Sequence, residues 1–60
     1  MAANSSYYKM YQDNQNYWRW TFYAANYEPI AVSSESYVHE RDCLHAIHLV
    51  QASSNSPIYK

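Results

Sequence analysis

The fold of this 60-residue chain is decided by one stretch, YWRWTFYA at residues 17–24. Successive side chains of an extended strand point to opposite faces, so alternate residues share a face. One face of this strand would carry Trp18, Trp20, Phe22 and Ala24, and the other would carry Tyr17, Arg19, Thr21 and Tyr23. The stretch is therefore predicted to be a strand with one apolar face and one tyrosine-rich face.

The segments on either side extend this strand into a sheet. Residues 7–12 are rich in strand-forming tyrosine, and the turn residues 13–16 would join them to residues 17–24 as a hairpin. A third strand is expected at residues 29–33, because Pro29 lacks a backbone N–H and therefore suits the first position of a strand.

A helix is predicted at residues 39–52, where Cys43, Ala46, Ile47 and Val50 recur at the spacing of one helical face. The expected class is α+β, an antiparallel sheet with one helix packed on one face. The sheet residues expected to meet this helix are Tyr8, Met10, Trp18, Trp20, Phe22, Ile30 and Val32. One helix covers only part of such a sheet, which favours a second subunit over the remaining apolar surface.

The composition excludes several classes of protein. A net charge of −1 offers neither duplex DNA nor an anionic membrane a cationic surface, and no apolar run approaches the ~18–20 residues of a membrane span. The single cysteine, Cys43, cannot form an internal disulfide, so a reducing, cytoplasmic location is expected. Residues 1–6 lack the basic and apolar regions of a signal peptide and are expected to be a flexible tail. A chain this short is marginal alone and needs a metal or a partner subunit.

Several ordered strings in the chain resemble the YegP-like family of small bacterial domains of unknown function. They are Trp18-Arg19-Trp20, Ala24-Ala25-Asn26, Glu28-Pro29-Ile30-Ala31, Ser33-Ser34-Glu35-Ser36-Tyr37, Cys43, Ala46-Ile47 and Val50. The resemblance implies a β-β-β-α-β unit over residues 7–60, present once here, and therefore a homodimer. It further implies that residues 56–60 form a strand exchanged between subunits, with Pro57, Ile58 and Tyr59 as the dimer strand. It supplies no enzymatic activity.

The chain departs from the family pattern in having no glycine. The family's glycines fall on Tyr27, Ser34 and Ser36, and on Asn16 as well. The family's Asn-Gly at 26–27 is typical of a two-residue hairpin turn with positive φ at both positions. Tyr27 at positive φ would cost on the order of 1 kcal/mol, unless the turn changes type. The loop at residues 34–36 raises the same question.

For each candidate catalytic or metal-binding residue, a purely structural role is the better interpretation. His45 and His48 are spaced to meet one metal ion, but two ligands are too few and both lie off the apolar helix face. His39 is read as a residue at the helix start, and Cys43 as a small hydrophobe in the core rather than a nucleophile. A grouping of Ser33, His39 and Asp42 has no supporting spacing. We therefore expect no catalytic, cofactor or metal site and no enzymatic activity.

The remaining candidate site is the tyrosine-rich face of the sheet. It would combine Tyr7, Lys9, Tyr11, Tyr17, Arg19, Thr21 and Tyr23. Such a face suits a dimer interface or a plain sheet surface, because tyrosine and arginine dominate interface cores. The leading prediction is a non-enzymatic, homodimeric cytoplasmic protein of unknown molecular role. The alternative is a binding module that stacks single-stranded nucleic acid or a small aromatic ligand on this face.

Overall fold

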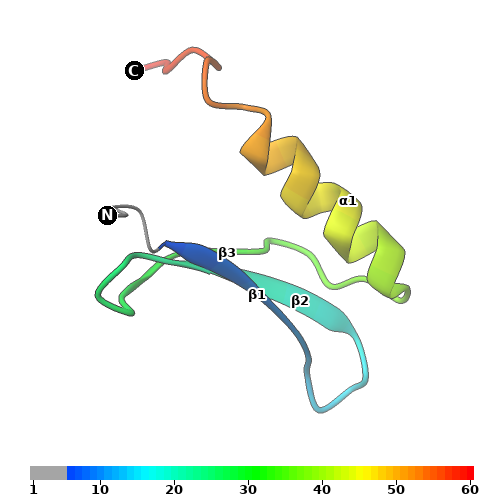
Figure 1. Ribbon diagram of the computed structural model, residues 1–60. Coiled ribbons are helices and arrows are strands. Elements are labelled where there is room, and N and C mark those ends of the chain that lie inside the picture. Colours follow the sequence, from blue (N-terminus) through cyan, green and yellow to red (C-terminus); the bar gives the residue numbers. More distant parts are fainter. Residues whose placement is uncertain (1–5) are drawn as a thin grey trace.

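The computed structural model describes residues 6–60, so the expected tail lies outside the described residues except for Ser6. The elements follow in the order β1 (Tyr7–Gln12), β2 (Trp18–Tyr23), β3 (Pro29–Val32) and α1 (Glu40–Gln51). The strands form one antiparallel sheet in the order β1-β2-β3, and α1 lies across one face of it (Figure 1). The predicted α+β class, with three antiparallel strands and one helix, is confirmed.

The register of β1 against β2 separates two faces, as the alternation predicted. Met10 lies opposite Trp20 on the face toward α1, and Lys9 lies opposite Thr21 on the other face. We call the side of the sheet away from α1 the outer face. The helix lies against β1 and β2 and makes no contact with β3 among the described residues.

The register of β3 corrects one expectation about the core. Val32 lies opposite Thr21, and Ala31 lies opposite Phe22, with an irregularity between Phe22 and Tyr23. Ala31 therefore faces α1, whereas Val32 and Ile30 belong to the outer face, and each of those two is 62% exposed. The prediction that Ile30 and Val32 meet the helix is wrong, because a one-residue change of register moves every side chain of a strand to the opposite face.

The helix is held on the sheet by very few buried residues. The buried apolar residues are Trp20, Cys43 and Ile47, and the partly buried residues packed around them are Tyr8, Met10, Trp18, Phe22 and Tyr37. Cys43 is 0% exposed and Ile47 is 4% exposed, which confirms that both face the core. The buried indole Nε1 of Trp20 has no hydrogen-bond partner among the described residues, so this small core is not fully satisfied.

Backbone pairs connect the segment before the helix to β2. The Ser33 N–H donates to the Trp20 carbonyl (2.9 Å), and the Trp20 N–H donates to Ser33 Oγ (3.3 Å). Tyr37 exchanges two backbone hydrogen bonds with Trp18, at 2.7 and 2.9 Å. These bonds hold the segment between β3 and α1 against β2. His39, at the end of this segment, takes the extended N-cap position of α1 without a side-chain capping bond.

The two hairpin turns, at residues 13–17 and 24–28, have the same construction. In each, the first residue donates its N–H to the carbonyl of the fifth (2.9 and 2.8 Å) and accepts a bond from the N–H of the fourth (2.9 Å in both). The fourth residues, Asn16 and Tyr27, have φ of 68° and 69°. This is the three-residue hairpin loop that ends in a left-handed residue. Tyr27 therefore keeps the positive φ, while the expected two-residue turn is replaced by a three-residue one.

The loop at residues 34–36 has a different backbone conformation from that of the two turns. Asn16 and Tyr27 are the non-glycine residues with positive φ in the described chain, so neither Ser34 nor Ser36 is left-handed. Serine therefore replaces the family's glycine there without a left-handed backbone.

Beyond α1 the chain turns away from the sheet. Ser53 donates both its N–H (3.1 Å) and its Oγ hydroxyl (2.6 Å) to the Val50 carbonyl, and these two hydrogen bonds to one acceptor lie at the end of the helix. Residues 56–60 form no regular secondary structure within this single chain and extend away from its body (Figure 1). Ile58 and Tyr59 are each 88% exposed. The exchange of this segment between two copies stays a prediction.

Candidate functional site

The outer face gathers most of the tyrosine-rich set at adjacent register positions. Tyr7 lies opposite Tyr23, and Tyr11 lies opposite Arg19. The rings of Tyr7 and Tyr23 stack with centroids 5.1 Å apart, and the ring of Tyr27 meets Tyr7 edge-on at 6.4 Å. Sequence reasoning missed Tyr27 as a member of this cluster, although a turn directly after Tyr23 could have suggested it. The result is a partly exposed aromatic cluster at the start of β1.

Arg19 is committed to the first hairpin turn. Its Nε donates to Asp13 Oδ2 at 2.8 Å, while Asp13 Oδ1 accepts the N–H groups of Gln15 (2.9 Å) and Tyr17 (3.0 Å). The hydrogen bond from Arg19, followed by the backbone bond from Tyr17, holds the pKa of Asp13 below its ordinary value. The Asp13–Arg19 pair therefore stabilises the turn and partly neutralises the cation that a phosphate group would need.

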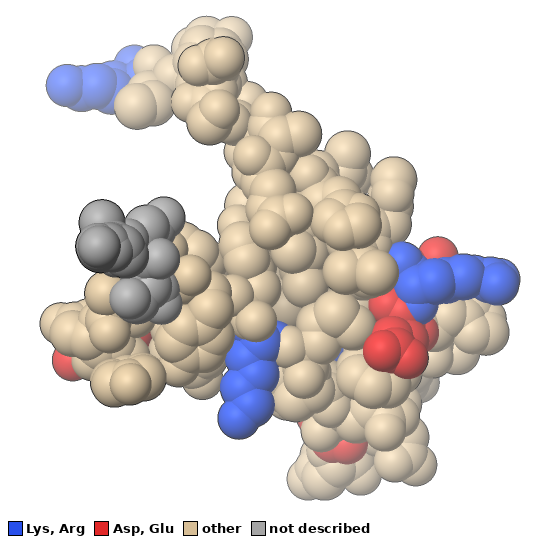
Figure 2. Space-filling model, viewed as in Figure 1, with Lys and Arg blue, Asp and Glu red and all other residues tan. Residues whose placement is uncertain are grey.

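Beneath these side chains the outer face is closely packed. Thr21 is 5% exposed, and its Oγ1 donates to the Tyr11 hydroxyl at 3.4 Å. Tyr17 lies outside β2, in the turn before it, with 39% of its surface exposed. Figure 2, which views the molecule from the side as in Figure 1, shows charged groups in a few separate places on an otherwise uncharged surface. The cations of the outer face are Lys9, which is exposed, and Arg19, which is already paired with Asp13, so this face offers little positive charge to a phosphate backbone.

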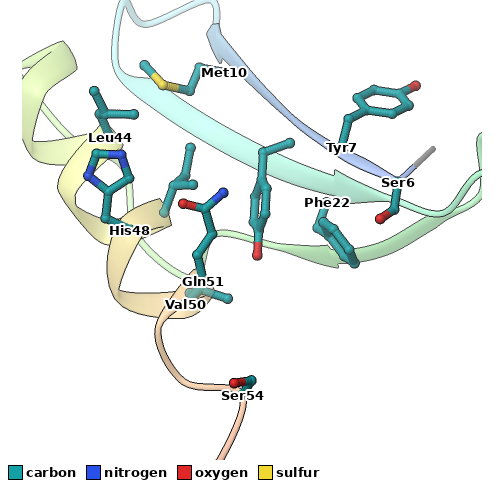
Figure 3. A pocket seen from close by; sticks show the side chains of 11 residues that line it. Ser6, Tyr7, Met10, Phe22, Leu44, His48, Val50, Gln51 and Ser54 are labelled. Carbon is teal, nitrogen blue, oxygen red and sulfur yellow. The ribbon is translucent and has the colours of Figure 1, made fainter. Parts of the chain in front are cut away.

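The second surface feature is a wedge, lined by both polar and apolar side chains, between the C-terminal half of α1 and the first half of β1. The helix diverges from the sheet toward its C-terminal end (Figure 1), which leaves a groove of about 890 Å³. Its walls are formed by Ser6, Tyr7, Tyr8, Met10, Phe22, Leu44, Ile47, His48, Val50, Gln51 and Ser54. In Figure 3, Leu44, His48, Val50 and Gln51 border it from the helix, and Met10 and Phe22 border it from the sheet. Sequence reasoning did not find this wedge, because it depends on the inclination of α1.

The polar and reactive side chains of α1 do not converge on a chemical site. His48 borders the wedge, and the described residues contain no group of three or more His, Cys, Asp or Glu side chains able to hold a metal ion. Burial raises the pKa of the Cys43 thiol, and the nearby charge of Glu40 raises it further. Cys43 is therefore a neutral packing group in this structure and not an activated nucleophile.

The described part of the chain also contains no helix with the length and apolar character needed to cross a membrane. Its one helix has 12 residues.

Comparisons with known proteins identify a family and assign no activity. A family model described as a domain of unknown function, DUF1508, matches residues 13–59. The UPF0339 protein NMB1088 of Neisseria meningitidis serogroup B is 35% identical over 48 residues, covering 80% of this chain and 84% of the relative. The UPF0339 protein NMA1193/NMA1859 of serogroup A shows the same identity and coverage. Both relatives are bacterial and neither carries an enzymatic name. The resemblance to YegP-like domains is thereby confirmed, and this chain belongs to the DUF1508 family of domains of unknown function.

Proposed function

We propose that this protein is a non-enzymatic, self-associating module, a homodimer in which residues 56–60 are exchanged between the two copies. The observation that carries the proposal is the surface of the single chain. Its accessible area is 4940 Å², whereas a compact monomer of 7.1 kDa exposes about 4,100 Å². The excess, roughly 800 Å², is similar in size to the area that one partner contributes to a standard protein interface.

The distribution of apolar groups supports the same proposal. Among residues 6–60 three apolar residues are buried, while Ile30, Val32, Ile58 and Tyr59 are each more than half exposed. A small domain without disulfides commonly gains its remaining stability from association. A second copy that exchanges residues 56–60 would bury Ile58 and Tyr59 without any further chain. The free, buried thiol of Cys43 fits a reducing cytoplasm as the place where the dimer acts.

Sedimentation velocity at micromolar concentration tests the proposal. The expected species has twice the 7.1 kDa mass of the chain, and deletion of residues 56–60 should shift it toward the monomer. A full-length protein that sediments as a monomer would refute self-association. A deletion variant that stays fully dimeric would refute strand exchange while leaving the dimer intact.

The alternative, a binding module for single-stranded nucleic acid or a small aromatic ligand, is supported by the cluster of Tyr7, Tyr23 and Tyr27 on the outer face. Tyrosine rings stack on bases with little sequence preference. The pairing of Arg19 with Asp13 weakens the nucleic-acid version. Titration of fluorescent oligonucleotide pools tests it: binding that falls with added salt and is lost in Tyr7→Ala would support this alternative, and absence of binding would reject it.

A further inference from the structure

We infer that the exposed ring of Tyr27, together with Tyr7, is the binding surface for a single nucleoside monophosphate, with the base stacked on Tyr27 and the phosphate beside Lys9. This inference rests on the binding-module alternative of the proposed function, and it names the class of ligand and the residues that would hold it. It does not depend on the exchange of residues 56–60, which belong to no strand of the sheet.

The backbone of Tyr27 is the first observation. The two hairpin turns share one construction, and the left-handed fourth residue is Asn16 (φ 68°) in one and Tyr27 (φ 69°) in the other. Asparagine tolerates this conformation, whereas a tyrosine there is strained. Strained residues cluster at ligand-binding and active sites. The strain at Tyr27 therefore points to a use of its ring.

The ring of Tyr27 is available to a ligand. It is 75% exposed, and it meets Tyr7 edge-on, with centroids 6.4 Å apart and an interplanar angle of 65°. Tyr7 is in turn stacked on Tyr23, with centroids 5.1 Å apart and an interplanar angle of 21°. Tyr7 and Tyr27 thus form a corner of two steeply inclined rings. A flat aromatic group can stack on Tyr27 and meet Tyr7 edge-on, which are the two arrangements that aromatic rings prefer.

Opposite charges lie on either side of this corner. Lys9 is two residues beyond Tyr7 on the same face of β1, and therefore roughly 7 Å along the strand. Lys9 is exposed, and the ion pair found among residues 6–60 is that of Asp13 with Arg19, so the Lys9 ammonium has no carboxylate partner there. Glu28 follows Tyr27 in the second turn and is also exposed. A ligand that matches this pattern carries an anionic group at one end and a hydrogen-bond donor at the other.

A nucleoside monophosphate whose base carries an amino group has this arrangement. The base supplies the flat ring, its exocyclic amino group is a donor for a carboxylate, and its phosphate is a partner for an ammonium group. A longer strand fits less well, because with Arg19 committed to Asp13 the outer face of the described chain offers one unpaired cation, Lys9. Further phosphates would therefore release no further counterions. The charges favour a single nucleotide over a nucleic acid strand.

Titration of isotope-labelled protein with adenosine monophosphate, followed by backbone amide chemical shifts, tests the inference. The matched variant is Tyr27→Asn, which removes the ring but places at position 27 the residue type that makes the same turn at position 16. Tyr27→Phe keeps the ring and should keep the affinity. Tyr17→Asn, before β2 and 39% exposed, is the control for the loss of a tyrosine outside the corner.

We expect the largest shifts at Tyr7, Lys9 and Tyr27. Loss of one stacked base should raise the dissociation constant roughly 5–100-fold in Tyr27→Asn, while Tyr17→Asn should leave it unchanged. Adenosine should bind roughly 2–5-fold more weakly than adenosine monophosphate, and Lys9→Gln should remove that difference, whereas Arg41→Gln on α1 should not.

Inosine monophosphate, which has a carbonyl group in place of the amino group, tests the role of Glu28. It should bind more weakly than adenosine monophosphate, and Glu28→Gln should remove that preference. Equal affinity of the wild type for the two nucleotides would contradict the placement of the amino group beside Glu28.

Three results would overturn the inference, and they are distinguishable. Equal affinity of Tyr27→Asn and the wild type would move the site away from this corner while leaving a binding module in place. A single-stranded oligonucleotide that binds more tightly with each added nucleotide, and loses affinity steeply in salt, would identify a strand as the ligand. If adenosine monophosphate, adenosine and the oligonucleotide all leave the spectrum unchanged, the binding-module alternative itself is refuted.

Discussion

The left-handed backbone of Tyr27 predicts a measurable difference in the free energy of unfolding between two variants at this position. Tyr27 has φ of 69°, a conformation that costs a residue with a Cβ about 1–2 kcal/mol and costs glycine almost nothing. Direct replacement of Tyr27 by glycine would also remove the edge-on contact with Tyr7 at 6.4 Å. We therefore compare Tyr27→Gly with Tyr27→Ala, because both variants lose that contact and only glycine is relieved of the backbone strain.

The magnitude follows from two opposing terms. Relief of the left-handed strain contributes about 1.5 kcal/mol, and the greater freedom of glycine in the unfolded chain costs about 0.8 kcal/mol. Tyr27→Gly should therefore be about 0.7 kcal/mol more stable than Tyr27→Ala. For a domain of this size that difference raises Tm by about 3–6 °C.

The control is Ala25→Gly in the same turn. Ala25 does not have a positive φ, so glycine there offers no relief and should destabilise the protein by about 0.4–1 kcal/mol. The assay is urea denaturation followed by circular dichroism, with every variant at the same protein concentration because the proposed association would contribute to apparent stability. If Tyr27→Gly proves no more stable than Tyr27→Ala, or if Ala25→Gly stabilises as much, the left-handed assignment of Tyr27 is refuted.

Three further predictions address the turn, the core and the tail. Because the folded-state pKa of Asp13 is lowered, its ionised form stabilises the fold at pH values above 3.8, the ordinary pKa of this side chain, and that contribution is lost as pH falls through the folded-state pKa. Urea midpoints should therefore fall less in Asp13→Asn than in the wild type between about pH 6 and pH 3, and equal slopes would contradict this role. The buried Cys43 thiol should react with a disulfide reagent only as fast as the protein opens, and fully in denaturant; immediate reaction of the native protein would contradict its burial. Ile58→Asp should raise the dimer dissociation constant roughly 100–10,000-fold by sedimentation equilibrium, since a dimer with two exchanged segments loses the burial of two isoleucine side chains, each worth about 1.5–3 kcal/mol. The matched Ile30→Asp, on the outer face of β3, should leave the dissociation constant unchanged, and equal effects would place the interface elsewhere.

Local pattern was enough to predict the elements because each carries its own period. The alternation at residues 17–24 predicted a strand whose apolar side carries Trp20, and the helical spacing of Cys43 and Ile47 predicted the residues that α1 buries. The absence of glycine, compared with the family pattern, predicted backbone strain in the turn where Tyr27 has positive φ. These features depend on neighbours within one or two turns of chain, which the sequence displays directly.

Features that depend on how the elements meet were decided by the tertiary structure. The register of β3 placed Ile30 and Val32 on the outer face, because an irregularity at one position reverses the direction of every later side chain. The pairing of Arg19 with Asp13 came from the geometry of the hairpin, since the two residues lie six positions apart and meet only when it closes. The inclination of α1 opened the wedge against β1, and no periodicity in the chain encodes an angle between a helix and a sheet. The sequence by itself thus determined the elements and the residues buried between them. The packing of α1 on the sheet decided which surfaces remain exposed.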